Sequence, residues 1–150
     1  MLSKLLVAFT LMATCVVLHA AGLTVAIRWL ERSLAALGGG SWRRLRMLIE
    51  VASLTVLVHL VEIAVWAVYY TSGGGMPDID SALYFSAVTY TTTGYGDLVL
   101  PAGWRLVGGV EALTGILMCG WSTGFFFAIV NQIFIRDTKT ASSTTDSGGS

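Results

Sequence analysis

Long apolar stretches alternate with short polar segments along the chain. Three of the apolar stretches cover residues 5–27, 47–70 and 106–135. Each exceeds the roughly 20 residues with which an α-helix crosses the hydrocarbon core of a bilayer. The pattern therefore predicts three membrane-spanning helices, with Trp66, Tyr69, Tyr70 and Trp104 expected as interfacial anchors.

A turn and a short helix are predicted between the second and third spans. Residues 73–77 contain three consecutive glycines and a proline, which is typical of a turn. Asp80 or Ser81 can then cap a helix that runs through Thr91. The carbonyl end of this helix, which is the negative end of its dipole, would point toward the residues that follow.

The residues that follow, 91–97, read TTTGYGD. Gly94 and Gly96 reach left-handed backbone regions without steric cost, so the two hands of backbone conformation can alternate here. Alternation points successive carbonyls the same way, and such carbonyls can replace the hydration shell of a cation. Thr92 can add a hydroxyl oxygen, and Tyr95 can brace the strand. Because one strand cannot surround a cation, the motif predicts several copies around an axis.

Residues 82–97, ALYFSAVTYTTTGYGD, resemble the pore helix and selectivity filter of tetrameric potassium channels. Residues 47–135 resemble the outer helix, pore loop and inner helix of the small prokaryotic members of that family. The resemblance implies an all-α membrane protein, a homotetramer that conducts K⁺ passively and is not an enzyme. It also implies K⁺ binding at Thr92, Thr93, Gly94, Tyr95 and Gly96, with filter support from Asp97, Tyr84, Phe85 and Val88.

The sequence departs from the best-known bacterial pattern at three points. Thr93 replaces a common Val or Ile and is expected to add a hydroxyl beside the middle sites. Val88 stands where some relatives carry a glutamate paired with the aspartate after the filter, so Asp97 must find another partner. Pro101 falls one residue later than usual, which predicts a slightly different outer-mouth loop.

Composition agrees with a membrane protein. Hydrophobic residues make up 55% of the 150 residues and charged residues only 12%, which is too apolar for a soluble domain of this length. The formal net charge is zero, so the chain as a whole indicates no nucleic-acid partner. Cys15 and Cys119 both fall inside apolar spans and are expected to be inert packing residues. No metal-ligand spacing is visible, and no cofactor is expected besides the permeant K⁺.

Arginines predict the orientation. The connection over residues 28–46 holds five arginines and one glutamate, so it is expected in the cytoplasm of a plasma-membrane protein. Glu50 is expected to pair with Arg46. The N-terminus is then outside and the C-terminus cytoplasmic, so the first helix is additional to the two-helix channels. Its apolar run is longer than the core of a signal peptide, which favours a retained helix.

Three regions follow from this organisation. Residues 1–46 form an N-terminal transmembrane helix with a basic connection, and residues 47–136 form a pore domain. Residues 137–150, which are rich in Ser, Thr and Gly, are expected to be a disordered cytoplasmic tail. Membrane lipid is an expected partner of the chain.

Ionisable residues inside the spans are candidates for function. Glu62 and Glu111 are both expected at the depth of the pore helix. In one interpretation they clamp that helix by hydrogen bonds to Thr, Tyr or Trp groups. In the other, low dielectric disfavours their charged form and makes conduction sensitive to pH. His59 can join them or simply pack, and His19 is expected to be structural.

The third span contains candidates for a gate. Gly115 falls near the hinge glycine of the family, and the residues that recur from it at i, i+4 are Cys119, Thr123, Phe127 and Asn131. Four Phe127 rings around the axis would form an apolar constriction that gates by dewetting. Alternatively, the aromatic residues 125–127 all face lipid or pack.

Two function classes compete with a potassium channel. A non-selective cation channel would keep the same fold but lose one or more filter sites. A non-conducting accessory subunit would show no conductance alone. Reversal potentials in potassium and sodium separate the first alternative, and flux through purified protein separates the second.

Overall fold

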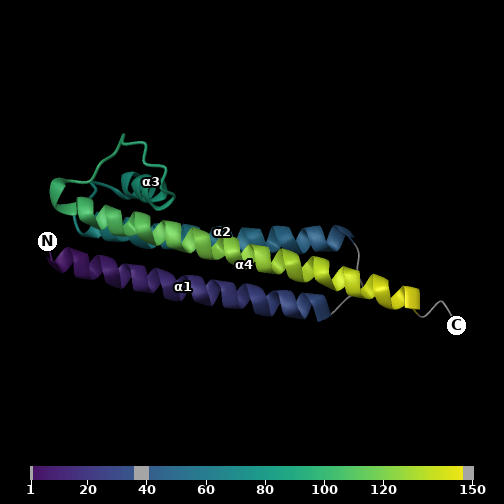
Figure 1. The fold of residues 1–150 in the computed structure, drawn as a ribbon. Coiled ribbons are helices and arrows are strands. Elements are labelled where there is room, and N and C mark those ends of the chain that lie inside the picture. Colours follow the sequence, from purple (N-terminus) through teal and green to yellow (C-terminus); the bar gives the residue numbers. More distant parts are fainter. Residues whose placement is uncertain (1, 36–40, 147–150) are drawn as a thin grey trace.

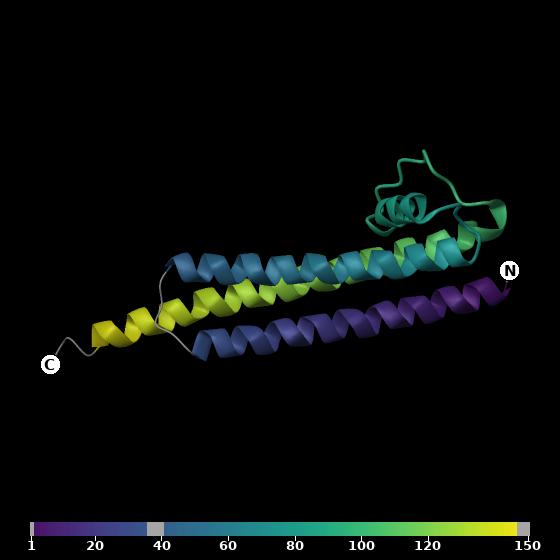
Figure 2. The ribbon, with the colours of Figure 1, turned by 180° about the vertical axis from the view of Figure 1, so that it is seen from behind.

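The computed structural model describes residues 2–35 and 41–146, and the regular secondary structure in these ranges is all helical. Its elements are α1 (Leu2–Ala35), α2 (Ser41–Ser72), α3 (Ile79–Tyr90), the 3₁₀ turn η1 (Ala102–Trp104) and α4 (Arg105–Asp146). The three long helices lie side by side, and the short α3 lies beside α2 and α4 at one end of the bundle (Figures 1 and 2).

The three predicted spans are present, and this is an all-α membrane protein. Helical segments long and apolar enough to cross a membrane cover Leu2–Arg32, Trp42–Ser72 and Ala102–Gln132. Both ends of the predicted basic connection are helical, because α1 continues to Ala35 and α2 begins at Ser41. The apolar pattern marks only the membrane-buried part of a helix, whereas arginine and leucine favour helix beyond it. Arg46 Nε lies 3.2 Å from Glu50 Oε1, which confirms the predicted pair.

The end of α4 differs from the prediction. The helix continues to Asp146, although residues 137–150 were expected to be disordered. Extending an existing helix by one residue is far easier than nucleating a new one, so a long apolar helix can carry a polar extension. The last four residues of the predicted tail, 147–150, lie outside the described residues.

Asp78 caps α3, in place of the predicted Asp80 or Ser81. The Ser81 amide donates to Asp78 Oδ1 at 2.8 Å, and the Ser81 hydroxyl donates to Asp78 Oδ2, also at 2.8 Å. An N-cap side chain accepts from the amide three residues later, so the cap belongs to the carboxylate at 78. The helix ends at Tyr90, with Thr91 as its C-cap.

The additional helix α1 packs along both α2 and α4. A Cβ on Gly22 would lie 2.4 Å from Val58 Cγ2, so the absence of a side chain there lets α1 and α2 approach closely. Near its N-terminus, Lys4 Nζ lies 3.9 Å from the centroid of the Trp104 ring. The start of α1 therefore lies at the α3 end of the bundle, and the end of α4 lies at the opposite end (Figure 1).

Three of the predicted interfacial anchors are core residues. Trp66, Tyr70 and Trp104 are all buried, and Tyr69 is half-buried. The sequence pattern placed them at the membrane surface because it could not show that α1 and α3 cover this end of α2. Trp104 also packs against Gly73 and Gly75 in the turn before α3, which fixes the turn to the start of α4.

Candidate functional site

The C-terminal end of α3 holds the first residues of the TTTGYGD segment by their amides. Thr92 N donates to Thr89 O at 2.9 Å. The Val88 carbonyl accepts two bonds, from Thr93 N at 2.9 Å and from Gly94 N at 3.2 Å. These contacts occupy the N–H groups of three consecutive residues on the α3 side and leave their carbonyl oxygens available for other partners.

Every second residue of this segment has a left-handed backbone conformation. Thr92, Gly94 and Gly96 have φ values of 58°, 56° and 78°. The left-handed region is open to glycine, but it costs a residue with a Cβ roughly 1–2 kcal/mol. The alternation expected from the two glycines is therefore present, and it extends one step further, to a threonine. Strained backbone of this kind is concentrated at functional sites.

The three threonine hydroxyls have different surroundings. Thr91 Oγ1 donates to Ala87 O at 2.7 Å, so it accepts from Thr93 Oγ1, which lies 2.9 Å away. The Thr93 hydroxyl is thus tied back to α3 rather than free beside the middle of the filter, as the sequence had suggested. Within the described part of the chain, the Thr92 hydroxyl has no hydrogen-bond partner. All nine residues 91–99 are exposed, and Tyr95 is 73% exposed.

Tyr84 is the partner of Asp97 that the sequence left open. Its hydroxyl donates to Asp97 Oδ2 at 2.6 Å, and Leu98 N donates to Oδ1 at 3.0 Å. The Tyr84 hydrogen bond lowers the pKa of Asp97 below its usual value, and Asp97 in turn raises the pKa of Tyr84. This contact joins the first half of α3 to the end of the TTTGYGD segment, 13 residues later.

Glu111 is buried and binds α3 from the α4 side. Tyr70 donates to Glu111 Oε2 at 2.7 Å, and Ser86 is hydrogen-bonded to Glu111 Oε1. Ser86 Oγ also lies 2.9 Å from Ile63 O, so one hydroxyl proton faces two acceptors. Each of these acceptors has a donor when Glu111 carries a proton and donates it to Ser86, which then donates to the Ile63 carbonyl. Phe85 packs edge-on against Tyr70, with ring centroids 5.4 Å apart.

Glu62 is also buried, and it joins side chains from all four helices. His19 Nδ1 lies 3.2 Å from Glu62 Oε1, and His59 Nδ1 lies 3.4 Å from Oε2. The Tyr90 hydroxyl donates to Glu62 Oε2 and lies 3.1 Å from His59 Nδ1. Ser122 Oγ lies 3.0 Å from Nε2 of both histidines.

The two carboxyl groups therefore clamp α3 at two residues one turn apart, Ser86 and Tyr90. They do so through separate partners, so the geometry favours the clamping interpretation over a directly coupled pair. His59 joins Glu62 rather than simply packing. The contribution of His19 was missed, and so was that of Ser122. The signal available in the sequence was the position of His19 itself, since a polar group inside an apolar span requires a polar partner.

Gly115 lies where α4 crosses the end of α3. A Cβ at this position would lie 1.9 Å from the Tyr90 carbonyl oxygen. The sequence suggested a hinge, but the structure gives a different reason for glycine, because any side chain would collide with backbone. The same backbone continues directly into the TTTGYGD segment.

The predicted gate residues lie further along α4. Cys119, Thr123, Phe127 and Asn131 are all exposed, with Phe127 67% exposed. The neighbouring rings Phe125 and Phe126 pack instead against the core cluster formed by Leu30, Met47, Val51 and Ile129. Of the three consecutive aromatic residues, Phe127 is therefore the ring that faces away from this bundle.

Three membrane-spanning helices with a short helix and an exposed loop between the last two define a multi-pass membrane protein of the pore-loop class. The sequence model of a family described as an ion channel matches residues 56–132, just over half of the chain. The chain belongs to this ion channel family. Comparison with curated proteins and with solved structures gave no match. The family match includes the last part of α2, α3 and most of α4, and it does not include α1.

Proposed function

We propose that this ion channel is selective for K⁺ and is built by four copies of the chain around one axis. The observation that carries the proposal is the alternation of left-handed backbone at Thr92, Gly94 and Gly96. In that conformation successive carbonyls point to the same side. Four such strands supply rings of oxygens that replace the water lost by a dehydrated K⁺.

The proposed coordinating oxygens are the carbonyls of Thr92, Thr93, Gly94 and Tyr95, together with the Thr92 hydroxyl. Two observations support this assignment. The amides of the first three residues are held by α3, and the Thr92 hydroxyl is unused within the described chain. The carbonyl end of α3 also places the negative end of its dipole beside Thr91, where it stabilises an approaching cation. Conduction of this kind is passive and involves no covalent step.

Exposure of residues 91–99 supports the assembly. A strained segment with unused oxygens and a mostly exposed tyrosine gains its missing contacts from neighbouring copies. The proposed orientation places this segment and the N-terminus outside the plasma membrane. It rests on the arginines near the other end of the bundle.

Purified protein in liposomes tests the selectivity. Bi-ionic reversal potentials in K⁺ and Na⁺ should show strong preference for K⁺, and Gly94→Ala should abolish it, since a Cβ disfavours the left-handed backbone. Gly103→Ala is a matched control, because Gly103 is exposed and a Cβ there meets nothing within 4 Å. Equal permeability to K⁺ and Na⁺ in the parent would make the protein a non-selective cation channel. The mass of the detergent-solubilised particle tests the assembly, and a monomer or dimer would contradict it.

A further inference from the structure

A cluster of polar side chains lies outside the proposed ion pathway, in the middle of the bundle. His19 comes from α1, His59 and Glu62 from α2, Tyr90 from α3 and Ser122 from α4. His19 and Glu62 are fully buried. One ligand atom from each of His19, His59 and Glu62 can be chosen so that all three lie within 4.8 Å of one another. Clamping α3 requires only Glu62 and Tyr90, so it leaves both histidines unexplained.

The imidazoles of the two histidines have the same orientation with respect to their neighbours. Both δ nitrogens face the two oxygens of one carboxylate, Glu62, at 3.2 and 3.4 Å. Both ε nitrogens face one hydroxyl oxygen, Ser122 Oγ, at 3.0 Å. A metal-bound histidine uses one nitrogen on the ion and donates its other N–H to an acceptor. A hydroxyl oxygen has two lone pairs, so Ser122 can accept from both rings at once.

We propose that His19, His59 and Glu62 form a binding site for a divalent transition-metal ion, for which Zn²⁺ is the best-suited candidate. Tetrahedral Zn²⁺ holds nitrogen and oxygen ligands at about 2.0–2.2 Å, which separates neighbouring ligand atoms by roughly 3.3–3.5 Å. The two nitrogen–oxygen distances at Glu62 match that separation. The Tyr90 hydroxyl, 3.1 Å from His59 Nδ1, lies beside the fourth position. Imidazole and carboxylate ligands suit zinc better than they suit Mg²⁺ or Ca²⁺.

A count of protons supports a cation at this place. With both histidines neutral and Glu62 ionised, His19 Nδ1–H donates to Glu62, and Ser122 donates to His19 Nε2. His59 Nε2–H then donates to Ser122, so His59 Nδ1 carries a lone pair. Three atoms, His59 Nδ1, Tyr90 Oη and Glu62 Oε2, are then close to one another but share a single proton, that of the Tyr90 hydroxyl. A metal ion between these atoms removes the conflict and balances a carboxylate buried in the bundle. The alternative to a metal ion is one additional proton between the same atoms.

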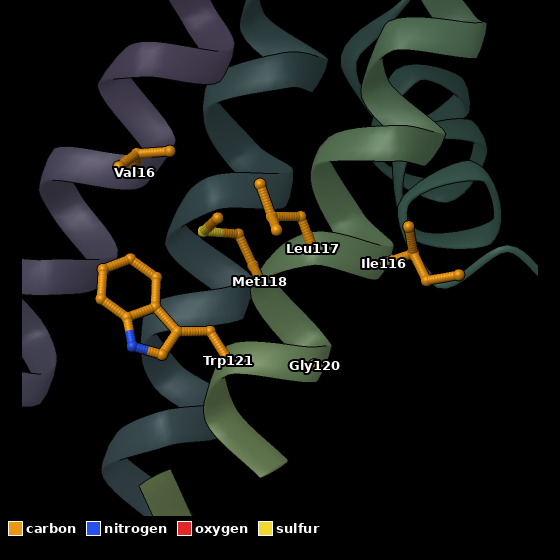
Figure 3. Close-up of a pocket in the computed structure, with 6 residues that line it drawn as sticks. All are labelled: Val16, Ile116, Leu117, Met118, Gly120 and Trp121. Atoms are coloured by element: carbon orange, nitrogen blue, oxygen red, sulfur yellow. The ribbon is translucent and has the colours of Figure 1, made fainter. Parts of the chain in front are cut away.

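A groove lies beside the site on one face of the bundle. An apolar groove of about 530 Å³ lies between α1 and α4, and Val16 and Trp121 line it (Figure 3). The Trp121 indole extends toward α1 in this view, and its ring centroid lies 5.4 Å from that of His19. Trp121 thus lies between the groove and the histidine.

The proposed role of the ion is to fasten α1 to the pore domain. The ion would link α1 to α2 directly, and to α3 and α4 through Tyr90 and Ser122. The α1 helix lies outside the region matched by the ion channel family, so His19 comes from the unmatched part of the chain, whereas His59 and Glu62 lie inside the match. Metal binding should stabilise the folded protein without being needed for ion selectivity.

The test is metal binding by the full-length protein, purified in detergent with a histidine-free tag and stripped with a chelator. After equilibration with micromolar Zn²⁺ and desalting, elemental analysis should find about one zinc per chain. The melting temperature should rise with zinc and fall again with chelator, because a ligand that binds only the folded state stabilises it. Co²⁺ in place of zinc should give the intense visible absorption of a tetrahedral site. None of these measurements depends on K⁺ flux.

Variants locate the site. Glu62→Gln and His19→Leu should each lose the zinc. Ser122→Ala, which removes no ligand and little volume, should weaken the affinity about tenfold or more. Glu111→Gln is the matched control, because Glu111 is a buried carboxyl that contacts α3 at another residue, and this variant should keep the zinc. The double variant Cys15→Ser, Cys119→Ser tests whether the thiols bind zinc, and it should also keep the zinc. No retained zinc in the parent, or equal zinc affinity in the parent and Ser122→Ala, overturns the proposal, as does loss of zinc in the cysteine variant.

Discussion

Replacing Gly115 by alanine tests whether this glycine is a hinge or a packing position. The new Cβ would lie 1.9 Å from Tyr90 O, 2.7 Å from Tyr90 C and 2.9 Å from Tyr90 Cα. Ordinary contacts begin at 3.4 Å, so α3 and α4 must separate by about 1.5 Å at their crossing. All three atoms are backbone, so no rotation of a side chain can relieve the collision.

The expected cost follows from two opposing terms. Overpacking a well-packed core typically costs about 1–3 kcal/mol, and a collision with backbone belongs at the upper end. Alanine recovers roughly 0.8–1 kcal/mol of helix propensity relative to glycine. The net loss should therefore be about 2 kcal/mol per chain. The displacement also reaches Thr92, two residues after Tyr90, so the proposed K⁺ selectivity should fall together with stability.

Thermal unfolding of the detergent-solubilised protein and bi-ionic reversal potentials in liposomes measure the two effects. Gly109→Ala and Gly120→Ala are controls in the same helix, because a Cβ at either position meets nothing within 4 Å. Both controls should match or exceed the parent in stability. A hinge predicts a different outcome for Gly115→Ala, namely altered open probability with unchanged or increased stability. That outcome would refute the packing explanation.

Glu111 and Asp97 give further predictions. The free energy of unfolding of Glu111→Gln should lie within about 1 kcal/mol of the parent value, since an amide can accept from Tyr70 and donate to Ser86. Glu111→Leu should lower it by about 2 kcal/mol or more, because both hydroxyls are left unpaired. Thermal unfolding measures both variants, and an equal loss in the two would contradict the hydrogen-bond assignment. If protonation of Glu111 also controls conduction, flux against pH should differ between Glu111→Gln and the parent, and identical curves would leave Glu111 a purely structural clamp. The pKa of Asp97 is lowered from 3.8 by Tyr84, so the Tyr84–Asp97 contact is intact above that value and is lost only as pH falls through the lowered pKa. In Tyr84→Phe the pKa should return toward 3.8, and acid inactivation of flux should begin at higher pH than in the parent. An unchanged acid profile would show that this contact does not support conduction.

The alternating backbone of residues 91–97 could be predicted from the sequence because its information is local. Two glycines two residues apart specify a backbone that alternates in hand, and the structure adds only that Thr92 adopts it as well. The partners of the buried polar groups are a different matter. His19 and Ser122 are 103 residues apart, and their contact depends on how α1 packs against α4. Apolar periodicity gives the length of a membrane helix but not the neighbour that each face meets.

The cap of α3 and the need for Gly115 illustrate the same limit at shorter range. Asp78, Asp80 and Ser81 are all acceptable caps by type, and only the position of the first helical turn selects Asp78. Glycine in the middle of a membrane helix is equally compatible with bending and with close packing. The distance to the Tyr90 carbonyl favours close packing, and that distance is a property of the tertiary structure.

Exposure of residues 91–99 in the single chain has a genetic consequence under the proposed fourfold assembly. Each copy then supplies only one quarter of every oxygen cage, so a cage with one defective quarter is defective as a whole. If a cell made equal amounts of parent chain and a Gly94→Ala chain, random mixing would leave roughly one tetramer in sixteen free of the mutant. Such an allele would be dominant over the wild type, whereas an allele that prevented the chain from folding would be recessive.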